Sequence, residues 1–140
     1  MASLSADQLT SIAQQLHDVA VAIGQFRLDQ IHDGAQLDDP CIVQLLGLQF
    51  SLLNTSSSFA LQAATIELAD ADKAADVIKS ATDDANVAIK NAAKINKVVT
   101  VASAVIVLAA AVMTGNMGSI FSAVDGVKNA IGGEPAVSAV

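Results

Sequence analysis

Residues 71–113, ADKAADVIKSATDDANVAIKNAAKINKVVTVASAVIVLAAAVM, decide the predicted fold of this 140-residue chain. Small and apolar residues recur along this stretch at alternating spacings of three and four, which places them on one side of a helix. The members of this set are Ala71, Ala74, Ile78, Ala81, Ala85, Ala88, Ala92, Ile95, Val99, Ala102, Ile106, Ala109 and Met113. The spacing predicts a single long, alanine-rich amphipathic helix from Ala71 to Met113.

The alanines on this helix predict close packing against another helix. A small side chain at the contact lets a neighbouring helix approach closely, either in tight antiparallel packing or in self-association. The helix-packing residues that we assign, called the alanine seam below, are Ala81, Ala85, Ala88 and Ala92. The expected partners of the seam are other helices, including those of a second copy of the chain.

The two halves of the long helix differ on the side away from the seam. Up to Lys97 this side is polar, and it carries Asp76, Lys79, Asp83, Asp84, Lys90, Lys94 and Lys97. Beyond Lys97 the equivalent positions are apolar, and they hold Val101, Ala104, Val105, Val107, Leu108, Ala111 and Val112. A helix that is apolar on every side must be buried all round, in protein or in lipid.

Charged side chains are confined to separate blocks of the sequence. Residues 1–39 carry a net charge of −5, residues 67–97 of −1 and residues 125–140 of −1, which gives −7 for the chain. Residues 40–66 and 98–124 contain no Asp, Glu, Lys or Arg. The acidic balance argues against a nucleic-acid partner, which needs a basic surface and usually stacking aromatic side chains. The 53% hydrophobic content excludes a disordered chain.

Helix boundary signals also occur in the first forty residues. Ser5 and Gln8 have the spacing of a capping box, in which both side chains bond amides of the first helical turn. Gly34 is a plausible end for this first helix, because glycine adopts the left-handed cap at low cost. Asp39 followed by Pro40 predicts the start of a second helix. Strand signals are poor throughout.

We therefore expect an all-α fold, a bundle of four to five helices in which the long alanine-rich helix runs into an all-round apolar segment. Residues 1–131 form a single predicted domain, and residues 132–140 a flexible C-terminal tail. The break between the second and third helices has two candidate positions. One is residues 54–58, whose polar side chains compete for backbone hydrogen bonds, and the other is residues 69–73.

The uncharged run at residues 98–124 makes membrane insertion the leading functional hypothesis. The residues that we expect to contact lipid are Val99, Val101, Val105, Ile106, Leu108 and Val112. Lysines just before an apolar run can meet lipid headgroups. The expected headgroup contacts are Lys90, Lys94 and Lys97. Gly115 and Asn116 would form the hinge or tip that follows the inserted helix.

This hypothesis gives the chain two states. In solution the other helices cover residues 98–124, and at a membrane they swing away so that this run inserts and copies self-associate through the alanine seam. The outcome would be pore-forming, toxin-like permeabilisation, or anchoring. The arrangement is similar in architecture to the α-helical pore-forming toxins, without a shared motif, so no residue role is carried over from them.

Two other classes of function remain open. Residues 98–113 span roughly 24 Å as a helix, which is shorter than a hydrocarbon core of about 30 Å. The chain has no Trp or Tyr, so it also lacks the usual interfacial aromatic belt. The first alternative is a soluble homo-oligomeric helical assembly or adaptor that binds partner helices. The second is a helical carrier of an apolar ligand.

Motifs for catalysis and cofactor binding are missing from the sequence. It has no Gly-rich phosphate loop, HExxH, CxxC or GxSxG motif, and Cys41 is its one cysteine. His17 and His32 lie about four helical turns apart, too far to share a metal ion on one helix. We expect no enzyme activity, no metal and no cofactor. The first residues do not resemble a cleavable signal peptide, so the expected location is cytoplasmic or leaderless-secreted, followed by membrane association.

Overall fold

The structure is a computed structural model that describes residues 2–132. Five helices and a pair of two-residue strands make up this part of the chain. In order, these elements are β1 (Ala2–Ser3), α1 (Ala6–His32), α2 (Pro40–Ala63), β2 (Glu67–Leu68), α3 (Ala71–Lys90), α4 (Ile95–Met113) and α5 (Met117–Gly132). The predicted all-α bundle of four to five helices is confirmed. Of the predicted tail, residues 133–140 lie outside the described residues.

The first helix starts and ends, and the second helix starts, where the boundary signals predict. The Ser5 side chain accepts a hydrogen bond from the Gln8 amide at 3.1 Å, and the Ser5 amide donates to Gln8 Oε1 at 2.8 Å. This capping box satisfies two amides that the helix itself leaves unpaired. Gly34 follows the end of α1 with a φ of 110°, in the left-handed region. At the start of α2, the Asp39 carboxylate accepts from the Cys41 amide at 2.8 Å, next to Pro40.

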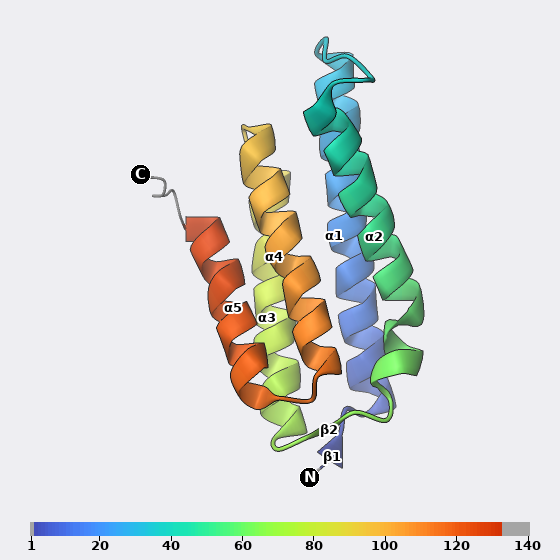
Figure 1. The fold of residues 1–140 in the computed structure, drawn as a ribbon, viewed down its shortest axis with the longest axis vertical. Coiled ribbons are helices and arrows are strands. Elements are labelled where there is room, and N and C mark those ends of the chain that lie inside the picture. The colour runs from blue at the N-terminus through green and yellow to red at the C-terminus, as the bar shows by residue number, and fades with distance from the viewer. Residues whose placement is uncertain (1, 133–140) are drawn as a thin grey trace.

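Successive helices run in alternating directions, so that the connections lie at the two ends of the bundle (Figure 1). The α1–α2 hairpin packs against α3 and α4, and α5 covers α3 and α4 on the side away from α1. At the lower end, β1 pairs antiparallel with β2, which ties the N-terminus to the α2–α3 connection. Gln8 on α1 donates to the Asp72 carboxylate on α3 at 2.8 Å at the same end.

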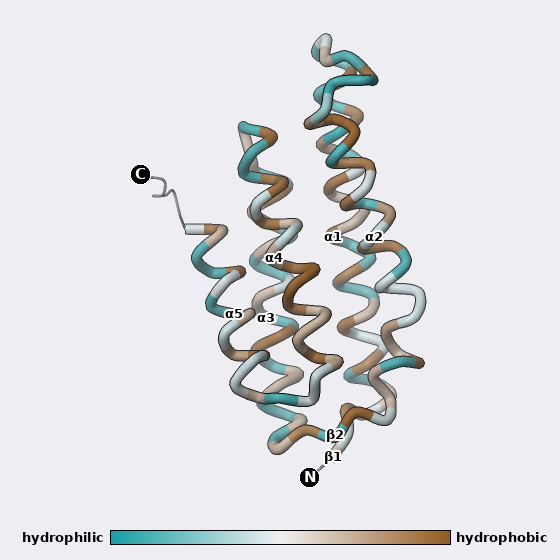
Figure 2. The backbone as a smooth tube through the Cα atoms, viewed as in Figure 1, coloured by the Kyte–Doolittle hydropathy of each residue, from teal (hydrophilic) through white to brown (hydrophobic). Residues whose placement is uncertain are grey.

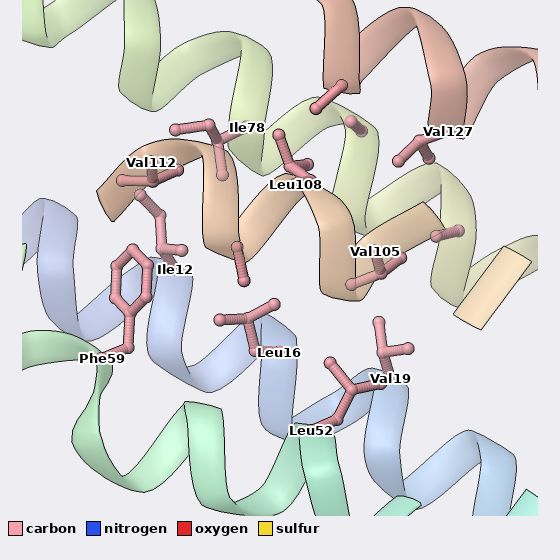
Figure 3. Packing of buried hydrophobic residues seen from close by; sticks show 14 of the residues in the cluster. Ile12, Leu16, Val19, Leu52, Phe59, Ile78, Val105, Leu108, Val112 and Val127 are labelled. Atoms are coloured by element: carbon pink, nitrogen blue, oxygen red, sulfur yellow. The ribbon is translucent and has the colours of Figure 1, made fainter. Parts of the chain in front are cut away.

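The core lies where α4 meets the other helices (Figure 3). Val105 lies on the side of α4 that faces Val19 of α1 and Leu52 of α2. Leu108 lies on the side that faces α3 and α5, towards Val127. Burial of such aliphatic side chains, at about 1.5–3 kcal/mol each, is the main source of stability in a helical bundle.

The predicted continuous helix from Ala71 to Met113 is wrong. The chain turns back on itself between Lys90 and Ile95, so α3 and α4 are separate antiparallel helices. The Asn91 amide still bonds Val87 O at 3.1 Å, but the Ala92 amide bonds Ile89 O, which tightens and ends the helix. A straight helix of this length would span roughly 65 Å and leave its apolar half uncovered. Tertiary burial therefore overrides the unbroken spacing.

The turn also changes which side of α4 faces the core. Val99, Ile106 and Met113 lie on the predicted apolar face, yet they are only half-buried. The most buried large side chains of α4 are one position away, at Val98, Val101, Val105, Leu108 and Val112. The core face of α4 thus combines these side chains with Ala102 and Ala109 of the predicted face, because the turn changes the rotation of the helix that follows it.

The serine-rich segment of α2 stays helical, and the helix break lies at residues 64–70, next to the second of the two predicted positions. Ser57 and Ser58 donate to carbonyls four residues earlier, at 2.9 and 3.0 Å. Ser56 instead donates to Ala13 O on α1 at 3.0 Å. These hydroxyls bond within and between helices, so they do not interrupt α2.

Candidate membrane-active hairpin

The helix α4 combines length and apolar character as the membrane hypothesis requires. It has 19 residues, about 28 Å at the usual helical rise, which is close to a hydrocarbon core of about 30 Å. Among residues 2–132 it is the one helix long and apolar enough to cross a membrane, by length and composition. Figure 2 shows its apolar stretch set between α5 and the α1–α2 hairpin.

The predicted lipid contacts divide into two groups in this structure. Val101, Val105, Leu108 and Val112 are buried in the bundle core, and Val99 and Ile106 are half-buried at its edge. The valine of α4 that faces solvent is Val107, which is 59% exposed. The structure therefore shows α4 with most of its apolar surface covered by its own chain.

Gly115 and Asn116, the predicted hinge, form a tight turn between α4 and α5. Gly115 has a φ of 70°, and a Cβ placed on it would lie 3.1 Å from Glu67 O and 3.3 Å from a methyl of Ile66. Glycine suits this position for its left-handed backbone and for its close approach to the β2 segment. Asn116 Oδ1 accepts from the Ser119 amide at 3.0 Å and so begins α5.

A groove of about 810 Å³ lies between α4 and α5, open to solvent. Its α5 wall includes Gly118, Ser122 and Gly126, small residues spaced four apart. Its α4 wall includes Ala104 and Ala111. The sequence interpretation did not include this stripe, although the repeated spacing of small residues was an available signal. Small residues spaced in this way are typical of helix contacts inside membranes.

The three predicted headgroup lysines lie at the upper end of the bundle. Lys90 and Lys94 are exposed on the α3–α4 turn. The Lys97 ammonium group donates to the carbonyl oxygens of Ala130 and Ile131, at the end of α5. A cation at this position satisfies carbonyls that the helix leaves unpaired and complements the negative end of the helix dipole. Lys97 therefore joins α4 to α5, while Lys90 and Lys94 project into water.

The alanine seam packs within the chain. Ala81 and Ala85 are fully buried, whereas Ala88 and Ala92 are half-buried near the α3–α4 turn. Beside the seam, the buried Thr82 hydroxyl bonds Gln15 Oε1 on α1 at 3.0 Å. In this state the helices that approach the seam are those of the same molecule.

Other chemistry that the described residues offer is sparse. Within residues 2–132, no three His, Cys, Asp or Glu side chains gather in an arrangement that could hold a metal ion. A second groove, of about 520 Å³, lies between α1 and α3, where the buried Oδ1 of Asn86 has no hydrogen-bond donor.

Comparison with known proteins found no matching family model, curated protein or solved structure.

Proposed function

We propose that this protein is membrane-active, and that residues 98–124 pass from the bundle into a lipid bilayer, where copies associate and permeabilise it. The observation that carries this proposal is the continuity of the uncharged run across a folded helical hairpin. The run covers α4 beyond Lys97, the Gly115 turn and the first half of α5 without an Asp, Glu, Lys or Arg. A helix whose residues 98–113 carry no charge, joined by a tight turn to a second uncharged segment, is a unit that lipid can accept.

Release of α4 needs lipid to replace the contacts of the core. Its five largest core side chains are Val98, Val101, Val105, Leu108 and Val112. At about 1.5–3 kcal/mol each, their exposure to water would cost about 8–15 kcal/mol, as much as the whole stability of a typical domain. In a bilayer the same side chains stay in an apolar environment. We therefore expect insertion to depend on membrane contact and α4 to stay buried in solution.

Self-association in the membrane is supported by the small residues of the α4–α5 groove. Gly118, Ser122 and Gly126 occupy one exposed side of α5, where they would let another helix approach closely. Lys90 and Lys94 are free to meet anionic headgroups beside the entry point of α4. These features favour oligomeric permeabilisation over a single inserted anchor.

The experiment that tests the proposal is a comparison of two exposed valines. Val107→Asp changes a residue of α4 that is 59% exposed, and Val87→Asp changes one of α3 that is 51% exposed. Both aspartates face water in the bundle, so both variants should keep the wild-type circular dichroism spectrum. A carboxylate near the middle of an inserted helix costs roughly 2.5–3.5 kcal/mol, about a 100-fold loss of the inserted state.

Dye leakage and flotation would be recorded together on anionic and neutral liposomes. Wild type and Val87→Asp should float and release dye, and Val107→Asp should lose most of both signals. Wild type that neither floats nor releases dye would refute the proposal. Flotation without leakage would refute permeabilisation and indicate an anchor. Equal insertion by both variants would show that α4 is not the inserted helix.

A soluble helical assembly is the second candidate function. The burial of Val101, Val105 and Leu108 in the core favours it, because a central helix of a soluble bundle needs the same apolar surface. This candidate predicts an oligomer without detergent and no effect of liposomes. The remaining alternative, a carrier of an apolar ligand, would place its ligand in the α4–α5 groove and predicts co-purified lipid in a monomer.

A further inference from the structure

The α1–α2 hairpin is longer than the helices that pack against it. α1 and α2 have 27 and 24 residues, whereas α3 and α4 have 20 and 19. Gly24 of α1 lies against the Gln49 side chain of α2, and Phe26 lines the same groove as Ile89, near the end of α3. The tip of the hairpin, residues 27–39, stands beyond α3, α4 and α5 (Figure 1). We call this segment the overhang.

The overhang is acidic and carries exposed apolar side chains. It contains Asp29, Asp33, Asp38 and Asp39 against Arg27, a net charge of −3 with neutral histidine. Its exposed large apolar residues, with their exposed fractions, are Leu28 at 55% and Leu37 at 68%. Water covers these side chains in a single molecule, so the overhang has unpartnered apolar surface.

Beside the overhang, the α3–α4 turn is basic. Residues 86–97, called the lysine ledge, contain Lys90, Lys94 and Lys97 and no acidic residue, a net charge of +3. The ledge lies at the same end of the bundle as the overhang but lower (Figure 1). One end of the molecule is thus a step whose upper and lower parts carry equal and opposite charges.

Part of the overhang is directed over the ledge. Val21 and Ala22 line the groove between α1 and α3. Leu28 and Asp29 come seven residues later on α1, so they project in nearly the same direction. Asp29 still lines this groove, together with Lys90 of the ledge, and the exposed Leu28 lies next to it on α1.

We propose that two copies of this chain pair in solution through this step, about a twofold axis, with the overhang of each copy resting on the lysine ledge of the other. A twofold operation brings the same surface of both copies together, so a surface with an acidic half and a basic half is self-complementary. Each charge contact then forms twice. The exposed leucines of the overhang lose water between the two antiparallel hairpins.

Charge complementarity in the folded state favours a second copy of this chain as the partner of the overhang. The acidic overhang would bind any basic surface of suitable shape, but the ledge of a second copy supplies the exposed Lys90 and Lys94 in a matching step, while Lys97 stays bonded to α5. The pairing needs no lipid and no movement of α4. Its test therefore succeeds or fails independently of the membrane proposal.

The experiment is sedimentation of the full chain with two charge-reversed variants. Asp33→Lys with Asp38→Lys makes both the overhang and the ledge basic, and Lys90→Glu with Lys94→Glu makes both acidic. Each variant alone should dimerise at least roughly 100-fold more weakly than wild type, because like charges meet at both contacts. An equimolar mixture should recover the dimer, since every acidic half then faces a basic half of the other variant.

Two controls define the result. The first control, Asp76→Lys with Asp125→Lys, changes the net charge by the same amount as Asp33→Lys with Asp38→Lys, but at exposed sites outside the step. This control variant should dimerise like wild type. Raising the salt from about 0.1 M to about 1 M shortens the screening length from about 10 Å to about 3 Å and should dissociate the wild-type dimer. If wild type is monomeric at about 100 μM, its dimer is far weaker than a specific dimer, and the proposal is overturned. A mixture that stays monomeric, or reversed variants that still dimerise alone, would overturn it as well.

Discussion

The helices α3 and α4 have almost the same length and bury the same number of residues, eight each, yet they differ in both of their faces. The core face of α3 is mainly alanine, and that of α4 is mainly valine with Leu108. The outer face of α3 carries charged residues such as Asp76 and Asp83, whereas beyond Lys97 the outer face of α4 carries none. Burial in the bundle is thus compatible with either kind of outer face.

The difference between the two outer faces sets the cost of transferring each helix from the bundle to lipid. Transfer of α3 to lipid would bury several charged side chains, each at a cost of roughly 2.5–3.5 kcal/mol near the bilayer centre. Transfer of α4 beyond Lys97 buries no charge. The outer face, which contributes little to folding, therefore decides whether the membrane state is accessible.

The largest effect that we expect comes from Val105→Asp, which places a carboxylate in the core without a partner. Because Val105 is buried, we expect loss of the fold: an unpaired buried charge costs roughly 4–5 kcal/mol or more. Urea unfolding followed by circular dichroism measures the effect, with Val107→Asp as the exposed control. A Val105→Asp protein as stable as wild type would remove Val105 from the core.

Substitution by leucine should distinguish the two core faces. Ala81→Leu adds volume where α3 packs tightly and should destabilise the fold by about 1–3 kcal/mol. Val101→Leu on α4 starts from a larger side chain and adds only one methylene, so it should cost less than Ala81→Leu. The midpoint of urea unfolding compares the two variants. Equal tolerance of leucine at both sites would contradict the difference in packing.

The turn that ends α4 should be more sensitive to substitution than the glycine that ends α1. Gly115→Ala strains a backbone with a φ of 70° and brings a methyl group within 3.1 Å of Glu67 O. We expect a loss of about 1–2 kcal/mol. Gly34→Ala meets nothing within 4 Å and is the matched control for backbone strain alone. A loss at Gly34 as large as that at Gly115 would show that the Glu67 contact has no effect.

The smallest expected effect concerns the starts of the two helices. Asp70 caps α3 by accepting from the Lys73 amide at 3.0 Å, whereas Lys94 precedes α4 with no side-chain cap. Lys94 already has an extended backbone, with φ −128° and ψ 142°. Lys94→Ser should therefore stabilise the fold by about 0.5–1 kcal/mol, and Asp70→Ala should destabilise it by about 1 kcal/mol. Thermal unfolding in high salt measures both, and a destabilised Lys94→Ser protein would contradict the prediction.

The parts of the fold that the sequence predicts correctly depend on local chemistry. The Ser5 capping box, the Gly34 stop and the Asp39–Pro40 start each involve groups within a few residues, so their geometry does not depend on the rest of the chain. The helical nature of most of the chain follows from spacing and composition in the same way. Ala81 and Ala85 of the alanine seam are buried in the core.

The parts that the sequence does not predict depend on long-range burial. The three-four spacing continues without interruption through residues 91–94, so it cannot reveal that the chain reverses there. After a reversal the helix faces its neighbours with a new rotation, which is why Val98 and Val105 are in the core and Val99 is at its edge. The α4–α5 groove and the step at the upper end exist only because these helices differ in length and pack side by side.

The sequence by itself determined that this chain is helical, where its first helices begin, and that residues 98–124 form an uncharged, largely apolar run. These properties follow from local hydrogen bonding and from the cost of exposing apolar surface. The tertiary structure alone decided what covers that run and which face of α4 is inward. It also decided that the acidic overhang and the lysine ledge lie at one end. Those outcomes come from contacts between segments far apart in the chain, and local spacing does not specify them.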